Sequence, residues 1–94
     1  MASCTGFEWD AGNAGKNRER HQVSDGECEQ VFFQRPILIA PDTTHSRDEP
    51  RYAALGQTAV RRRLTIVFTI RGESIRVISA RPMSRRERRL YEQA

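Results

Sequence analysis

The clearest alternation of hydrophobic and polar positions runs through residues 64–82. From Leu64 to Arg71 every second residue is a large apolar one, and β-branched and aromatic residues are abundant. This period of two predicts a strand. Gly72-Glu73 then fits a two-residue hairpin turn, and a second strand follows that ends at Pro82. The hairpin register places these apolar residues on one core face: Leu64, Ile66, Phe68, Ile70, Ile75 and Val77.

The opposite face of this hairpin carries polar and charged side chains. In the same register Thr69 pairs with Arg76 and Val67 with Ile78, and Arg71 lies beside them. Arginines next to threonines on a sheet face are suited to hold a phosphate. The register puts Arg81 on the other side, from where it reaches this face only round the strand end or across a bulge.

Two capping boxes mark helix starts. Ser24 and Glu27 have the S-x-x-E spacing, and the apolar stripe that follows makes Cys28 a packing residue. Ser84 and Glu87 repeat the spacing at the start of a short basic helix. This helix carries four arginines, and we expect its last apolar residues to dock it: Leu90 and Tyr91.

The N-terminal part gives weaker signals. Residues 7–9 alternate and predict a brief first strand, with Trp9 as a core residue. Asp10 suits a helix N-cap. The helix that follows it contains Gly12 and Gly15, each of which costs about 1 kcal/mol of helix propensity.

Two further strands are predicted at residues 36–41 and 51–58, with a polar loop, 42–50, between them. This loop contains three residue types that ligate metals, but without the spacing of a metal motif. We interpret them as exposed loop residues: His45, Asp48 and Glu49.

The length of 94 residues predicts one domain, residues 1–94, with residues 1–6 as a frayed leader. No apolar run reaches the roughly 18 residues of a membrane span, and no signal-peptide pattern is present. Cys4 and Cys28 have neither metal nor redox spacing. We therefore expect a reduced, cytoplasmic protein that does not enter a membrane.

Charge is distributed unevenly. Residues 1–60 hold 6 basic and 9 acidic residues, whereas residues 61–94 hold 10 Arg and 3 Glu. Fifteen of the 16 basic residues are Arg, whose planar guanidinium makes bidentate contacts with phosphate. The basic C-terminal third indicates a nucleic acid or an acidic protein as partner, and the simpler alternative is a solvated helix face.

Two blocks of this sequence resemble the BrnT family, and together they extend from Phe7 to Tyr91. The first is FEWD at residues 7–10, followed by Asn17 and by Arg20-His21 with Val23. The second is RGESIRVISAR at residues 71–81, followed by a basic segment, SRRERRLY, that ends at Tyr91.

The resemblance implies an α+β, RelE-like fold with two N-terminal helices, a mainly antiparallel sheet of about four strands and a short C-terminal basic helix. It implies a ribonuclease toxin of a type II toxin–antitoxin system that arrests translation. The implied partner is a BrnA-like antitoxin that has a ribbon-helix-helix region. The toxin is expected to contact operator DNA only through this antitoxin.

The chain departs from the family pattern at two positions. Asn13 stands where the family commonly has Lys, so the role of that lysine is in doubt or falls to Lys16. Gln22 follows His21 where Gly is usual, so we expect a different backbone geometry in that turn. Neither change touches the arginine block.

RNA cleavage without a metal or cofactor needs a base for the 2′-hydroxyl, an acid for the leaving 5′-oxygen and positive charge at the phosphorane. The acid or base role calls for a side chain of the histidine type, so His21 is the candidate, with Glu73 and Tyr91 as alternatives. An alternative role for His21 is to bond free carbonyls at a helix end. The implied catalytic residues are His21, Arg71, Arg76 and Arg81, and the implied RNA-binding residues are Lys16, Arg20, Arg51, Arg85 and Tyr91.

A second hypothesis belongs to another class: a non-catalytic basic module that binds RNA or protein through the same arginines. A direct DNA binder is disfavoured because the sequence has no helix-turn-helix or zinc pattern.

Overall fold

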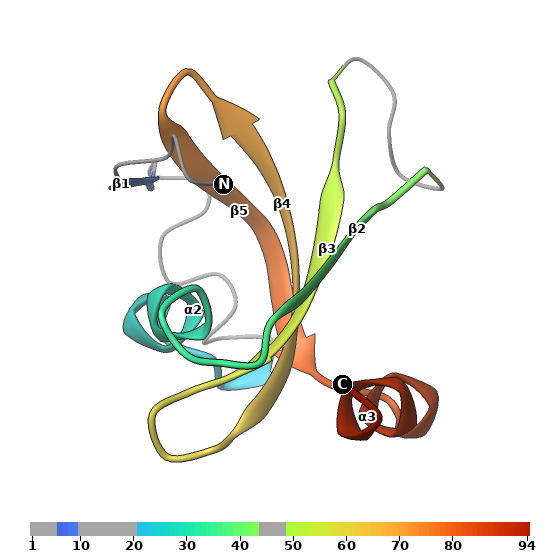
Figure 1. The fold of residues 1–94 in the computed structure, drawn as a ribbon. Helices are drawn as coiled ribbons and strands as arrows, with labels where there is room; N and C mark the ends of the chain where they lie inside the picture. Colours follow the sequence, from blue (N-terminus) through green and yellow to red (C-terminus); the bar gives the residue numbers. More distant parts are fainter. Residues whose placement is uncertain (1–5, 10–20, 44–48) are drawn as a thin grey trace.

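A computed structural model describes residues 6–9, 21–43 and 49–94 of the chain, and Figure 1 shows its fold. Five strands form one sheet in the order β1-β5-β4-β3-β2, in which β1 runs parallel to β5 and all other neighbours are antiparallel. The elements are β1 (Gly6–Glu8), α2 (Asp25–Val31), β2 (Leu38–Pro41), β3 (Tyr52–Gln57), β4 (Arg63–Arg71), β5 (Ser74–Pro82) and α3 (Arg85–Glu92).

The expected architecture of two N-terminal helices and about four strands is wrong. The described residues form one helix before the sheet's long strands, α2, and one after them, α3. The sheet has a fifth strand because residues 6–8 pair along the edge of β5, which makes it a mixed sheet. The weak helix predicted after Asp10 falls at residues 10–20, outside the described residues.

The β4–β5 hairpin confirms the predicted register only as far as the pair Phe68–Val77. Beyond it Val67 pairs with Ser79, so Ile78 has no partner on β4 and forms a β-bulge. A bulge adds one residue to one strand and so reverses the alternation of faces beyond it. Arg81, now opposite Thr65, therefore lies on the same sheet face as Arg76, which corrects the prediction that it lies on the other side.

α2 covers the apolar face of the sheet. Its Val31 packs so closely on β3 that a Cβ at Gly56 would lie 2.6 Å from a Val31 methyl carbon. Phe68 of β4 stands at the centre, edge-on to the Phe32 ring at 5.1 Å and stacked with Tyr52 at 5.6 Å. Cys28 is fully buried here, and burial raises the pKa of its thiol to about 12, as expected for a packing residue.

α3 docks on the opposite sheet face, so the two helices flank the sheet (Figure 1). Both predicted capping boxes are present, at Ser24–Glu27 and Ser84–Glu87. Tyr91 is only 4% exposed and anchors α3, whereas Leu90 is 53% exposed, so the prediction that Leu90 docks the helix is wrong. Neither of the two described helices is long and apolar enough to cross a membrane.

Candidate functional site

Two arginines and a glutamate meet on the polar face, where β1, β4 and β5 run side by side. In the strand register, Glu8 of β1 lies beside Arg76 of β5, and Arg76 lies opposite Thr69 of β4. Arg71 follows Thr69 by two residues on β4 and so lies on the same face. The Oε1 atom of Glu8 is 3.5 Å from Nη1 of Arg76 and 3.7 Å from Nη1 of Arg71. One carboxylate oxygen thus lies between two guanidinium groups. We call these three residues the Glu8 cluster.

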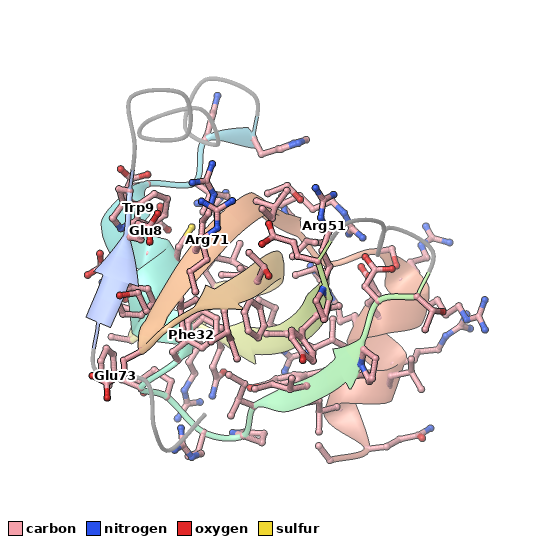
Figure 2. All side chains as sticks on the ribbon, turned by 90° about the horizontal axis from the view of Figure 1, so that it is seen from above. Glu8, Trp9, Phe32, Arg51, Arg71 and Glu73 are labelled. Atoms are coloured by element: carbon pink, nitrogen blue, oxygen red, sulfur yellow. The ribbon has the colours of Figure 1, made fainter. Side chains whose placement is uncertain are left out.

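The segment before β3 closes one side of the Glu8 cluster. Glu49 Oε1 lies 3.4 Å from Arg71 Nη2, and the carbonyl of Pro50 accepts a 2.7 Å hydrogen bond from the Thr69 hydroxyl. Figure 2 shows Arg51 on the same side of the sheet as Arg71. The expected role of Arg51 in RNA binding stays a prediction.

The contacts within the Glu8 cluster are long for ion pairs. Charge-assisted hydrogen bonds between nitrogen and oxygen usually measure about 2.7–2.9 Å. Arg71 lies 3.7 Å from Glu8 and 3.4 Å from Glu49, and Arg76 lies 3.5 Å from Glu8. The side chain of Arg71 is 45% exposed. Contacts this loose are inexpensive to exchange for those of a bound phosphate.

Arg81 is held differently, although the bulge brings it to the same face. Its two terminal nitrogens donate to both carboxylate oxygens of Glu87, at 2.7 and 2.9 Å. Glu87 also accepts from the Thr65 hydroxyl and from the Ser84 backbone amide. These donors, the Arg81 guanidinium first, lower the pKa of Glu87 to about 2. The structure thus uses Arg81 to fasten α3 to the sheet.

Three other candidates do not join the cluster. Tyr91 is buried and donates a 2.6 Å hydrogen bond to the carbonyl of Pro36, and burial raises its pKa. Figure 2 shows Glu73 well apart from Arg71 and Glu8. Arg85 is exposed on α3.

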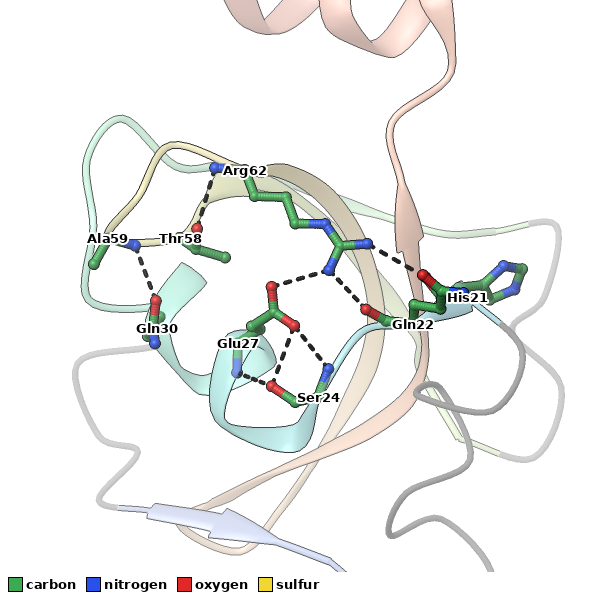
Figure 3. Close-up of polar contacts among 8 residues, drawn as sticks. All are labelled: His21, Gln22, Ser24, Glu27, Gln30, Thr58, Ala59 and Arg62. Carbon is green, nitrogen blue, oxygen red and sulfur yellow. Dashed lines mark hydrogen bonds and ion pairs between the residues drawn. The ribbon is translucent and has the colours of Figure 1, made fainter.

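His21 lies at the other end of the sheet. The guanidinium of Arg62, which precedes β4, donates to the carbonyls of His21 and Gln22, at 3.3 and 2.7 Å, and pairs with Glu27 at 2.9 Å (Figure 3). Arg71 ends the same strand, about 30 Å farther along it at roughly 3.3 Å per residue. The structure therefore does not bring His21 to the Glu8 cluster.

The turn after His21 corrects one expectation. Gln22 has a φ of 57°, in the left-handed region that favours glycine, so the predicted change of backbone geometry is wrong. The hydrogen bond from Arg62 to its carbonyl helps to hold this conformation. Two further candidates for RNA binding, Lys16 and Arg20, lie outside the described residues.

Sequence reasoning missed Glu8 and Glu49 as members of the site. Alternation at residues 7–9 does put Glu8 on the face opposite Phe7 and Trp9, and that was the available signal. Nothing in the sequence shows that β1 pairs in parallel with β5. Glu49 was interpreted as an exposed loop residue, and within the described residues no group of three or more His, Cys, Asp or Glu is placed to hold a metal ion.

A carboxylate between two exposed or half-buried guanidinium groups can accept a proton beside a bound phosphate. These are the groups of a protein that binds or cleaves a phosphodiester. The family model for the ribonuclease toxin BrnT of type II toxin–antitoxin systems matches residues 9–87. The chain belongs to this family, which implies ribonuclease activity and an antitoxin as partner. No curated protein matches the chain significantly.

The Glu87 contacts predict a pH dependence of stability. Folding lowers the pKa of Glu87 from its ordinary 4.5, so its stabilisation is complete above pH 4.5 and is lost as the pH falls toward 2. Glu87→Gln should cost about 1.5–3 kcal/mol at pH 7, the range for hydrogen bonds to charged groups. It should also flatten the decrease in unfolding free energy between pH 7 and pH 3, measured with urea. An equally steep decrease in the variant would contradict this assignment.

Proposed function

We propose that this protein is a metal-independent endoribonuclease that cleaves RNA at the Glu8 cluster and so arrests translation in the cytoplasm. The observation that carries the proposal is the position of the Glu8 carboxylate between Arg71 and Arg76, at 3.7 and 3.5 Å. Family membership supports the activity class, and the long contacts of Arg71 with Glu8 and Glu49 support a phosphate as the ligand.

The proposed reaction uses the 2′-hydroxyl of RNA as the nucleophile. Glu8 accepts the hydroxyl proton while the 2′-oxygen forms a bond to phosphorus. Arg71 and Arg76 bind the non-bridging oxygens, on which negative charge grows in the phosphorane. The bond to the 5′-oxygen then breaks, and that oxygen takes up a proton. The products are a 2′,3′-cyclic phosphate and a 5′-hydroxyl, and no redox partner is needed.

Arg51 is the proposed contact for a neighbouring phosphate, because it lies on the same side of the sheet as Arg71 (Figure 2). Arg81 has a supporting role in this proposal. Its bidentate pair with Glu87 leaves it engaged with α3, and it acts by holding the sheet face in shape.

Single substitutions in the Glu8 cluster test the proposal. Arg71→Ala and Arg76→Ala should each reduce kcat for RNA cleavage about 10²–10³-fold, the loss typical of one transition-state donor. Glu8→Gln keeps the size of the side chain but accepts a proton far less readily, so it should lower kcat about 10²–10⁴-fold and leave RNA binding nearly unchanged. Arg35→Gln, at an exposed arginine that bonds only backbone carbonyls, is the control and should leave kcat unchanged.

The same assay decides between this proposal and two others. If His21→Ala costs as much as Glu8→Gln while the fold is intact, the proton transfer belongs to His21. If purified, partner-free protein binds RNA without producing fragments, the protein is a non-catalytic binding module and the proposal fails.

We also propose that the antitoxin is BrnA-like, that it covers the Glu8 cluster with an acidic segment, and that operator DNA is reached only through it. Charge complementarity of this kind mainly raises the association rate, and salt weakens it. Arg71→Ala should therefore slow association with the co-expressed product of the neighbouring reading frame, measured by surface plasmon resonance. A control with Arg35→Gln should associate as fast as the parent. Absence of any complex on co-expression would contradict the proposal.

A further inference from the structure

The outward side of α3 carries four arginines whose side chains have no partner among the residues that the structure describes. Glu87 and Tyr91, one helical turn apart, bind the sheet and so fix which side of α3 faces inward. At 100° per residue, the four arginines all lie within about 100° of the outward direction. All four are exposed, and none of their side chains has a hydrogen bond or ion pair within the described part of the chain: Arg85, Arg86, Arg88 and Arg89.

This charge pattern costs α3 stability. Arg85 and Arg89 are like charges at i,i+4, a spacing that destabilises a helix by a few tenths of a kcal/mol. Arg85 and Arg86 also occupy the first turn, where the helix dipole disfavours positive charge. The capping box and the buried Tyr91 already account for the position of the helix. Arg89 lies in the last turn, where the dipole favours positive charge, but Arg85 and Arg86 do not stabilise the helix.

Several arginines elsewhere in the described residues contact carboxylates, although Arg35 and Arg61 do not. Arg62 pairs with Glu27, Arg63 with Glu92, and Arg81 with Glu87, all at 2.9 Å or less. α3 is thus the element on which four arginines without a carboxylate partner among the described residues are gathered within five residues. A polyanion gains most where no intramolecular ion pair has to be broken first.

We propose that the outward side of α3 binds the phosphate backbone of the RNA substrate, apart from the Glu8 cluster where the RNA is cleaved. This inference rests on the proposed ribonuclease function and adds where the substrate is held. The guanidinium fork binds carboxylate and phosphate alike, so RNA is favoured over an acidic peptide because the family is that of a ribonuclease toxin.

The distance between α3 and the Glu8 cluster sets the length of RNA that can contact both. Arg63 at the start of β4 contacts α3 through Glu92, and Arg71 at the end of β4 belongs to the Glu8 cluster. These two positions are about 26 Å apart along the strand, at roughly 3.3 Å per residue. An RNA that touches both must extend over several nucleotides, so a dinucleotide should lose the contribution of α3.

Binding of a non-cleavable RNA tests the inference separately from catalysis. The probe is a fluorescein-labelled, single-stranded 2′-O-methyl oligoribonucleotide, which lacks the free hydroxyl needed for cleavage. Its Kd is measured by fluorescence anisotropy over a range of salt concentrations. The parent is compared with Arg85→Gln/Arg89→Gln and with the exposed control Arg35→Gln.

In a plot of log K against log salt, each lost phosphate contact should reduce the slope by about 0.7, so the double variant should lose about 1.4. Arg35→Gln should keep the slope of the parent. Thermal unfolding should show the double variant to be as stable as the parent or slightly more stable, because repulsion in α3 is relieved. A role confined to the fold would instead lower Tm.

The outcomes separate the two proposals. If the double variant keeps the parent slope, the inference is wrong, whether or not the protein cleaves RNA. If the double variant keeps the parent slope but no longer binds the antitoxin, α3 is a protein interface and the inference is also wrong. If the slope falls but natural RNA is not cleaved by the parent, α3 binds RNA and it is the proposed ribonuclease function that fails.

Discussion

The parallel pairing of β1 with β5 is the contact on which the candidate site depends. It places Glu8 directly beside Arg76, from a position 68 residues earlier in the chain. Two core-side anchors hold β1 in register. Phe7 packs edge-on against Phe32 at 5.6 Å, and the indole of Trp9 donates a 2.8 Å hydrogen bond to Glu29. With both neighbours facing the core, Glu8 is forced onto the polar face.

The arginines fall into three groups by what opposes their charge, and each group suits a different task. Arg81 makes short bidentate contacts with Glu87 and secures α3. Arg71 contacts Glu8 and Glu49 at 3.7 and 3.4 Å, and Arg76 contacts Glu8 at 3.5 Å, distances at which a phosphate can compete with the carboxylates. The side chains of the arginines on the outward side of α3 have no partner among residues 6–9, 21–43 and 49–94, and they supply charge that is not compensated there. Ion-pair geometry thus divides a uniform arginine-rich sequence into structural and ligand-binding parts.

Local signals in the sequence were sufficient for the hairpin turn and both capping boxes, since these depend on residues a few positions apart. The bulge at Ile78 was not foreseen, because periodicity alone cannot show where an extra residue leaves the ladder. The parallel pairing of β1 and the burial of Tyr91 in place of Leu90 depend on distant parts of the chain. The position of His21 away from Arg71 and Arg76 also depends on a distant residue, because Arg62, next to the start of β4, bonds the His21 carbonyl.

The central claim is that the Glu8 cluster cleaves RNA by attack of the 2′-hydroxyl without a metal. End-group analysis of the fragments produced by purified protein in the presence of EDTA tests it most directly. We expect 2′,3′-cyclic phosphate and 5′-hydroxyl ends, at a rate that the chelator does not change. Fragments with 3′-hydroxyl and 5′-phosphate ends, or loss of cleavage in EDTA, would contradict the claim.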